Sequence, residues 1–409
     1  MKTLIHRLLH TSDWHIGRKL KEHDRSQEFR KFFDDLLKII HDENIDALLI
    51  AGDIFDNTTP SVQAQDMYYS LLSRLVNSPC RHIVIISGNH DSPAFLDAPA
   101  DLLKLCRIHV IGQARPDPAD EVLTLRAPDG SPELIVCAVP YLRDRDVRTL
   151  TPSDSPSDTE QALTDGIRTH YEQVFTHARG LQGDANIPVI AMGHLFMQGG
   201  RTRIDDGTRE LYVGTAIRVG GDIFPEWLTY TALGHLHSPQ KAGGRENIRY
   251  SGSPIAMGFG EAGQKKSVYI LELDGKNLVD IHEIDIPEYQ KLARINGDLP
   301  QIFEQLRALA GTDESVWVDI TYTGEEITAN LQEKLQEFIN TAPLVDVLSV
   351  HDESRRPNLP STVIPDGLDN IKPLEMLKLC FNAYNTPEEQ RKVFTAMYME
   401  ILRDMGEDY

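Results

Sequence analysis

Long apolar runs and paired cysteines are both missing from this sequence of 409 residues. No stretch approaches the roughly 18 consecutive apolar residues of a membrane-spanning helix, and the first residues do not follow the pattern of a signal peptide. The four cysteines, Cys80, Cys106, Cys137 and Cys380, form no C-x-x-C pair. Their scatter argues against a structural zinc site and against a disulfide framework. The sequence therefore predicts a cytoplasmic protein with buried, free thiols.

Positive charge is also scarce in this chain. It has 41 Lys and Arg residues against 62 Asp and Glu residues, which gives a formal net charge of -21. Extensive binding of nucleic acid needs clustered basic residues, so any such contact must come from local basic loops, bound cations or a partner subunit. The candidate basic residues, each of which also fits an ordinary solvated loop, are Arg18, Lys19, Lys21, Arg201, Arg203, Lys265 and Lys266.

The first part of the chain alternates apolar strands with amphipathic helices. Three short apolar runs predict strands at 8–11, 46–51 and 82–87, and two segments between them have apolar residues at helical spacing, 29–40 and 62–76. Successive βαβ units of this kind form a parallel sheet covered by helices. Later apolar runs predict the strands of a second sheet at 187–192, 228–233, 248–251, 267–273 and 279–286.

The length of the chain allows two or three domains, and its character changes near residue 287. We expect a first domain over 1–286, with a surface loop at 151–159. A small α/β domain over 287–352 would contain strands at 292–295, 316–321 and 345–350 and helices at 301–309 and 331–339. A linker with three prolines, 353–372, then leads to a helix pair within 373–409, whose second helix is capped by Thr386 and begins at Pro387.

Polar side chains follow the predicted strands at the points where they end. The five ligand-bearing groups are Asp13-Trp14-His15, Gly52-Asp53, Gly88-Asn89-His90-Asp91, Gly193-His194 and Gly234-His235-Leu236-His237. Sites in open α/β sheets gather at the carboxyl ends of the strands, and Asp-x-His and His-x-His spacing places two side chains on one side of an extended segment. A lone histidine or an Asp after Gly is usually structural. Five such groups in succession instead favour a pair of divalent metals held by carboxylate, amide and imidazole ligands.

These five blocks resemble the calcineurin-like metallophosphoesterases. Three phrases, at 11–17, 51–56 and 250–254, are more narrowly similar to the nuclease subunits that work with a coiled-coil ATPase in bacterial DNA repair. The resemblance covers about residues 8–285. It implies a two-sheet α/β (α+β) sandwich flanked by helices, followed by the small α/β domain as a DNA-capping domain and by the helix pair.

The resemblance also assigns roles to the ligand-bearing residues. It implies two divalent ions, most simply Mn²⁺, one held by Asp13, His15 and His237 and the other by Asn89, His194 and His235, with Asp53 bridging them. His90 would act as general acid, with Asp91 orienting its ring. Two points stay open: whether His90 is a purely structural residue, and whether Asp56 is a turn residue or a support for the site or has a direct role in it.

The implied activity is hydrolysis of DNA by a two-metal mechanism in repair, recombination and replication. The chain would be a double-strand 3′-5′ exonuclease and a single-strand and hairpin endonuclease, with ATP used by the partner. Two nuclease chains, dimerised through helices near 62–76 and 93–105, would join two ATPase chains, and the helix pair would dock on the partner's coiled coil or fold back. The rival functions are a small-nucleotide phosphodiesterase or phosphatase with the same metal site, and a noncatalytic scaffold.

Overall fold

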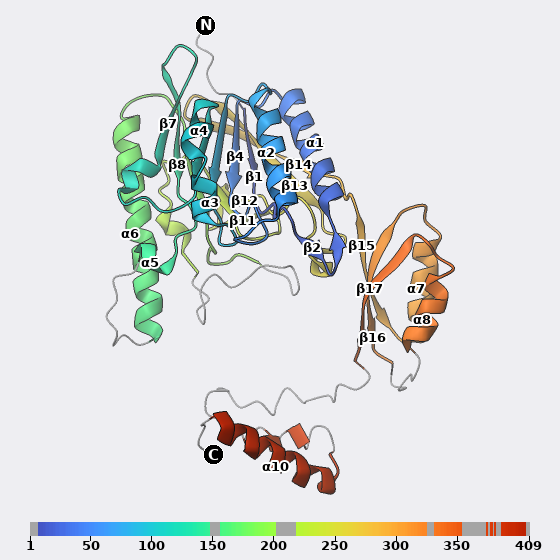
Figure 1. Ribbon diagram of the computed structural model, residues 1–409. Helices are drawn as coiled ribbons and strands as arrows, with labels where there is room; N and C mark the ends of the chain where they lie inside the picture. The colour runs from blue at the N-terminus through green and yellow to red at the C-terminus, as the bar shows by residue number, and fades with distance from the viewer. Residues whose placement is uncertain are drawn as a thin grey trace. The chain divides into compact units, whose positions relative to one another are not determined.

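The computed structural model describes residues 7–147, 156–201, 218–324 and 331–353, together with parts of 374–405 (Figure 1). The chain divides into two compact units. The first contains Met1–Arg294 and Asp313–Val318, and the second contains Ile295–Thr312 and Asp319–Tyr409. The first unit holds two six-stranded sheets.

The first sheet has the order β14-β13-β1-β4-β5-β6. Its strands are β1 (Arg7–Thr11), β4 (Ala47–Ala51), β5 (His82–Ile86), β6 (Ile108–Ile111), β13 (Lys266–Asp274) and β14 (Asn277–Ile286). β1, β4, β5 and β6 are parallel, as expected for βαβ units, whereas β13 pairs antiparallel with β1. The prediction that 267–273 and 279–286 complete the second sheet is therefore wrong. An apolar pattern marks a strand as buried but does not say which sheet edge it covers.

The second sheet has the order β11-β12-β10-β9-β8-β7. Its strands are β7 (Val122–Arg126), β8 (Pro132–Ala138), β9 (Val189–His194), β10 (Tyr230–Gly234), β11 (Gln240–Ala242) and β12 (Arg245–Tyr250). The predicted strands at 187–192, 228–233 and 248–251 are confirmed as β9, β10 and β12. β8, β9, β10 and β12 run parallel, so the carboxyl ends of β9 and β10 share one edge.

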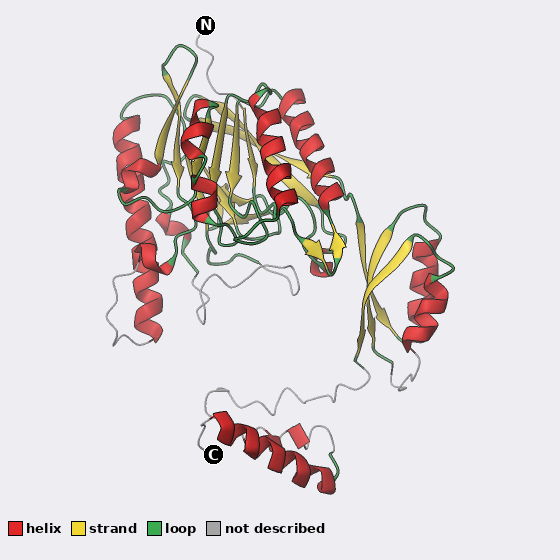
Figure 2. Cartoon of the chain, viewed as in Figure 1, coloured by secondary structure: helices red, strands yellow, loops and turns green. Residues whose placement is uncertain are grey.

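Helices cover the outer faces of both sheets, which gives four layers (Figures 1 and 2). The helices of the first unit are α1 (Ser26–Asp42), α2 (Val62–Val76), α3 (Pro93–Asp97), α4 (Ala100–Leu105), α5 (Asp144–Val147) and α6 (Pro156–Gln182). α1 and α2 pack on the first sheet, and α6 packs on the second. Residues alternate along β1: Leu9 faces the helices and Leu8 faces the other sheet. Residues 156–159, predicted as part of a surface loop, form the start of α6, so this part of the prediction is wrong. Residues 151–155 lie outside the described residues.

A three-stranded sheet with two helices follows the first domain in the sequence. It consists of β15 (Lys291–Gly297), α7 (Leu299–Ala310), β16 (Val316–Tyr322), α8 (Leu331–Ile339) and β17 (Val345–Asp352), in the strand order β15-β16-β17. These elements match the predicted ones. A capping box formed by Asp298 and Gln301 starts α7. The helix expected from Pro387 is confirmed as α10 (Glu388–Met405), whereas the linker and most of the first helix of the pair lie outside the described residues.

The sequence also predicts that the cysteines are buried and free and that no helix spans a membrane. Cys80 and Cys137 are buried and free, as expected, but Cys106 and Cys380 are exposed. Cys106 caps α4, a short helix with no buried residue, so its thiol has no core to enter. Among the helices of the described residues, none has the length and hydrophobicity needed to cross a bilayer.

The two sheets approach closely at Gly234, the last residue of β10. A Cβ at this position would collide with the carbonyl oxygen of Ala51 and lie 2.8 Å from Nδ1 of His194. We therefore expect Gly234→Ala to destabilise the protein by about 1–3 kcal/mol, because the clash is with backbone that cannot move aside. The shift of the urea midpoint measures this effect.

The matched control is Gly180→Ala in α6, where an added methyl group meets nothing within 4 Å. Alanine favours helix over glycine, so this variant should be as stable as the parent or slightly more stable. Equal midpoints for Gly234→Ala and the parent protein would contradict the close packing of the two sheets.

Candidate metal centre

The predicted ligands come together at one edge of the two sheets. Asp13 and His15 follow β1, Asp53 follows β4, and Asn89 follows β5. The second sheet contributes His194, the last residue of β9, and His235 and His237 after β10. Asn89 is half-buried, and the other six side chains belong to the buried residues. The structure thus gathers all seven residues from five strand ends of two sheets.

The backbone at this edge adopts an unfavourable conformation at four of the seven residues. Positive φ angles occur at Asp13 (53°), His15 (50°), Asp53 (51°) and His235 (105°). Such angles cost on the order of 1–3 kcal/mol each for residues other than glycine and persist only where the surrounding structure enforces them. Here the enforcing contacts are backbone hydrogen bonds from Asp13 N to Gly52 O (3.0 Å) and from His15 N to Asp53 O (2.9 Å).

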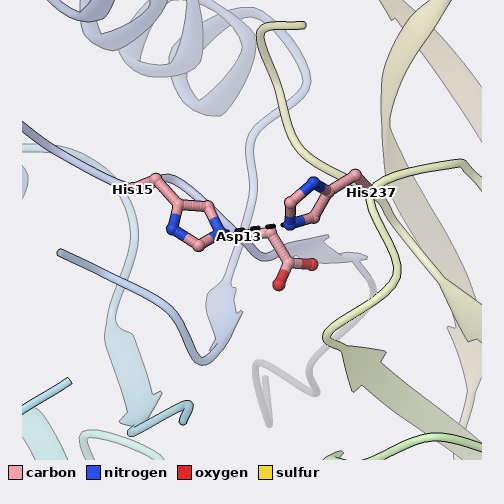
Figure 3. Close-up of side chains that lie close together, drawn as sticks. All are labelled: Asp13, His15 and His237. Carbon is pink, nitrogen blue, oxygen red and sulfur yellow. Dashed lines mark hydrogen bonds between the residues drawn. The ribbon is translucent and has the colours of Figure 1, made fainter. Parts of the chain in front are cut away.

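One group that could hold a metal ion consists of Asp13, His15 and His237, with both rings beside the carboxylate (Figure 3). The Nε2 atoms of His15 and His237 lie 3.1 Å apart. A neutral imidazole has one N–H and one lone pair, so two ring nitrogens at this distance either share a proton or face a common cation. The carboxylate of Asp13 also accepts the backbone N–H of His235 at 2.8 Å, which ties this group to the next.

The second group lies around His194. Its Nδ1 donates to the carbonyl of Ala51 at 3.0 Å, so Nε2 keeps its lone pair in the neutral ring. This Nε2 lies 3.0 Å from Oδ1 of Asn89 and 3.4 Å from Oδ2 of Asp53. The same Oδ2 lies 3.5 Å from Nε2 of His15. Asp53 is thus the carboxylate between the two groups.

The chemistry of these atoms fits two divalent cations. Oδ2 of Asp53 and Oδ1 of Asn89 lie within 3.4 Å of Nε2 of His194, and Nε2 of His15 faces Nε2 of His237. In the described part of the chain, Nε2 of His235 and Nδ1 of His15 are buried without a hydrogen-bond partner. His235 lies beside His194, with ring centroids 5.5 Å apart. Carboxylate and amide oxygens together with imidazole nitrogens that lack hydrogen-bond partners are the usual ligands of a borderline or hard divalent ion.

The histidines of the site differ in the direction in which their surroundings shift the pKa. Burial opposes protonation of His194, but the Asp53 carboxylate outweighs it and raises the pKa of His194 to about 9. Burial dominates at His15 and His235 and lowers the pKa of both rings well below the ordinary value. Burial also opposes ionisation of Asp53, yet the neighbouring histidines hold its pKa well below the usual range. Asp53 is therefore ionised and the rings of His15 and His235 are neutral.

The residues beside Asn89 differ from the prediction in one respect. Nδ1 of His90 lies 2.8 Å from the backbone carbonyl of Asp56, and the backbone N–H of His90 donates to Oδ1 of Asp53 at 2.9 Å. The carboxylate of Asp91 instead accepts backbone N–H groups of Ile54, Phe55 and Gly88. Asp91 therefore holds the loops together, and the prediction that it orients the His90 ring is wrong. The carbonyl of Asp56 has that position.

Burial raises the pKa of Asp91 to about 7, the charge of Asp53 adds to the rise, and the backbone N–H groups oppose it. Asp56 lies behind the site on the other side: its Oδ1 accepts from Arg18 at 2.9 Å and lies 3.7 Å from Nδ1 of His15. Asp56 thus contacts the His15 ring through its carboxylate and the His90 ring through its backbone carbonyl, as a support for the site would. Its carboxylate also forms, with His15 and His90, a group that could hold a metal ion, so a direct role for Asp56 stays a prediction.

The candidate basic residues differ in their burial and in their ion pairs. Lys266 is buried and paired with Glu261, so it is not available to a nucleic acid, contrary to expectation. Lys265 is exposed and pairs with Asp285 at 3.0 Å. Lys19, in the short strand β2 (Lys19–Leu20), and Lys21, in the turn after it, are also exposed. Arg201 is exposed, and Arg203 lies outside the described residues.

Glu261 and Lys266 support the site in a way that the sequence does not indicate. Glu261 lies 3.3 Å from Nδ1 of His237, and Lys266 lies behind it. Glu261 belongs to a loop, in the 3-10 turn η3 (Phe259–Glu261), and no strand ends before it. The rule that functional residues follow the ends of strands therefore does not predict Glu261. Only the folding of this loop against the carboxyl end of β10 brings the carboxylate to the site.

A helix-flanked two-sheet sandwich with metal ligands at one common sheet edge defines a calcineurin-like metallophosphoesterase. In agreement, residues 6–239 match the family described as Calcineurin-like phosphoesterase, and residues 288–385 match Type 5 capsule protein repressor C-terminal domain. The chain belongs to the calcineurin-like phosphoesterases and, within them, to the SbcD proteins. It is a metal-dependent phosphoesterase that binds divalent cations.

Two relatives show the narrower relationship. The D chain of the nuclease SbcCD from Escherichia coli K12 is 35% identical over 346 residues, which cover 84% of each chain. The corresponding SbcCD chain of Rhodobacter capsulatus is 36% identical over 318 residues, or 75% of this chain and 76% of that protein. Among solved structures, a protein of Thermus thermophilus is similar with a TM-score of 0.39 and 11% identity, covering 69% of this chain and 100% of that one.

The raised pKa of His194 makes metal binding dependent on pH. Since that pKa is about 9, the ring carries a proton at pH 7.5, and a cation that takes Nε2 must displace it. We expect Mn²⁺ binding at pH 7.5 to release about one proton from this ring and to strengthen as the pH rises towards 9. Calorimetry in buffers of different ionisation enthalpy measures the release.

A His194→Gln variant should lose this component of proton release. His109→Gln, which changes a half-buried histidine on β6 whose pKa is lowered to about 4, should retain it. Metal binding to the unaltered protein with no release of protons would contradict the assignment of His194 as a ligand.

Proposed function

We propose that this chain is the nuclease subunit of a bacterial DNA-processing complex and hydrolyses DNA phosphodiesters with two Mn²⁺ ions. The observation that supports the proposal is the set of seven candidate ligand residues at one sheet edge, in a chain whose relatives are named as nucleases. Asp13, His15 and His237 would hold one cation, Asn89, His194 and His235 the other, and Asp53 both. When bound, the cations supply Lewis acidity that activates water and offsets negative charge on the phosphate.

The residues around the ligands have separate tasks in this proposal. His90 is fixed by its backbone N–H to Asp53 and by its Nδ1 to the carbonyl of Asp56. Since Nδ1 keeps its proton for that carbonyl, Nε2 is the atom that would give a proton to the leaving oxygen. Burial of the ligands keeps competing water away from the charged groups and strengthens their interactions.

We further propose that the substrate is chromosomal DNA, attacked as a double-strand 3′-5′ exonuclease and a single-strand or hairpin endonuclease in the cytoplasm. The energy of ATP would enter through SbcC, the partner implied by the names of the relatives. A partner also accounts for the charge of the chain. At a net charge of -21 the nuclease subunit alone has little general attraction for DNA.

The proposed contact with SbcC is α10, close to the end of the chain. Val393, Phe394 and Met397 of this helix are 57%, 47% and 56% exposed. Apolar side chains in such a row on one helix are what a coiled coil would cover. Docking of this helix on the coiled coil of SbcC is therefore favoured over folding back. The small α/β domain that precedes it in the sequence would cap the DNA.

A dimer of nuclease chains, within an assembly of two SbcC and two SbcD chains, is supported by a second apolar surface. Large exposed apolar side chains occur on α2 at Val62, Tyr69 and Val76, and on α4 at Leu102 and Leu105. Exposed clusters of this kind mark interaction surfaces. A small-nucleotide phosphodiesterase or phosphatase has no need of these features, and a noncatalytic scaffold has no need of a complete ligand set.

Variants of the ligand and of the proposed acid test the activity. Asp53→Asn should abolish Mn²⁺-dependent hydrolysis of linear and hairpin DNA in the complex with SbcC and ATP, because the carboxylate between the two ligand groups is lost. His90→Ala should slow the reaction by roughly 10²–10⁴-fold while Mn²⁺ binding persists. With an aryl phosphodiester, whose phenolate leaves without protonation, His90→Ala should be far less damaging.

The matched control is His41→Ala, since His41 lies exposed at the end of α1. It should leave both activities unchanged. If the chain cleaves small phosphodiesters but never DNA, even with SbcC and ATP, the small-nucleotide phosphodiesterase is the correct function.

Removing residues 366–409 should abolish binding to SbcC while Mn²⁺-dependent nuclease activity of the chain remains. Phe394→Ser combined with Met397→Ser should weaken binding by at least tenfold, because both side chains lie on the exposed face of α10. Leu181→Ser, which changes a 47% exposed leucine on α6, is the control and should bind as the parent does. Calorimetry with purified SbcC measures the affinity, and retained binding by the truncated chain would refute docking through α10.

A further inference from the structure

A buried ion pair lies directly behind one ring of the metal centre. The Glu261 side chain is fully buried, and its Oε1 lies 3.3 Å from Nδ1 of His237. Its Oε2 forms an ion pair with the ammonium group of Lys266, which is only 6% exposed, and accepts the backbone N–H of Met257 at 3.1 Å. The ring of His237 thus has a charged carboxylate on one side and the Nε2 of His15 on the other.

Lys266 contacts the main chain of the same histidine. Its Nζ donates to the carbonyl of His237 at 3.1 Å and to Oγ of Ser253 at 2.9 Å. The backbone N–H of Ser253 donates to the same carbonyl, also at 3.1 Å. The ion pair therefore fixes His237 at two points, with Lys266 at the backbone and Glu261 at the ring.

Stability alone does not account for this arrangement. The cost of removing two opposite charges from water offsets much of their attraction, so an apolar pair of similar volume would serve the fold as well. Removing one partner, in contrast, leaves an uncompensated buried charge. A role that depends on the contact with His237 explains why charged groups occupy this position.

The carboxylate determines which nitrogen of His237 carries the proton. A carboxylate facing Nδ1 favours the N–H on that atom, and the lone pair is then left on Nε2, which faces the metal group. The other histidines differ in what faces Nδ1. Nδ1 of His194 donates to the neutral carbonyl of Ala51. Nδ1 of His15 lies 3.7 Å from the carboxylate of Asp56, farther than the 3.3 Å between His237 and Glu261, and that carboxylate also accepts a hydrogen bond from Arg18.

We propose that Glu261 is a positioning residue that fixes His237 in its Nδ1–H form and strengthens Nε2 as a metal ligand. As a consequence, the cation position at Asp13, His15 and His237 binds Mn²⁺ more tightly than the position at Asn89, His194 and His235. The inference rests on the two-metal centre of the proposed function, and it adds that the two positions are unequal and that a residue outside the ligand set causes the difference.

Titration of the full chain with Mn²⁺, followed by calorimetry and by electron paramagnetic resonance of free Mn²⁺, tests the inference. The parent protein should show one tight and one weaker site. Glu261→Gln keeps the shape of the side chain but removes its charge, and it should weaken the tight site by about 10–100-fold while the weaker site stays unchanged. Circular dichroism of each variant checks that the chain is folded.

Two further variants separate positioning from simple damage. Glu261→Gln alone leaves the charge of Lys266 uncompensated, so the double variant Glu261→Gln with Lys266→Met removes both charges and should show the same selective loss. The control is Glu133→Gln, which changes a carboxylate that is also 1% exposed or less but pairs with Arg81 and His82 outside the metal centre. Its two Mn²⁺ affinities should match those of the parent.

The outcomes distinguish this inference from the proposed function. If the parent protein binds two Mn²⁺ ions and Glu261→Gln leaves both affinities unchanged, the role of Glu261 is refuted and the metal centre stands. An equal loss at both sites, or a similar loss in Glu133→Gln, also overturns the inference, because the effect would then not be specific to His237. If the parent protein binds no Mn²⁺, the proposed two-metal centre itself fails.

Discussion

Backbone pairing that continues past the ends of two strands is the interaction on which the metal centre depends. Beyond β1 and β4, Asp13 and His15 still donate hydrogen bonds to the backbone of Gly52 and Asp53. This pairing holds three candidate ligands, Asp13, His15 and Asp53, in left-handed conformations. Without it, the same residues would relax into ordinary loop conformations, and their side chains would no longer converge.

The second requirement is close contact between the two sheets. The apolar layer between them includes Leu49 and Val84 from one sheet and Ile190 and Ala232 from the other. It sets the separation at which histidines from β9 and β10 meet carboxylates from β1 and β4. Glycine at 234 permits this approach, since any side chain there would collide with Ala51. The geometry of the site is therefore a property of the packed core as much as of the loops.

The sequence predicts that the candidate ligands come together because they follow a rule: polar residues at the ends of parallel apolar strands meet at one edge. The same rule does not reach Glu261, which is in a loop, or the part played by Asp91, whose carboxylate binds backbone N–H groups and not the His90 ring. Apolar periodicity likewise identified β13 and β14 as strands but not as the edge of the first sheet. Which strand pairs with which is decided by contacts between residues far apart in the chain, such as Leu8 and Leu271.

The residues with left-handed backbone conformations in the metal centre lower the stability of the fold while they serve its activity. At His235, with φ at 105°, the backbone suits glycine better than any L-residue with a side chain. Conformational strain thus lies at the positions of the candidate ligands, and the fold as a whole compensates for it. A chain with glycine at such a position is expected to be inactive but more stable than the active one, which makes it a natural starting point for engineering a stable scaffold without phosphoesterase activity.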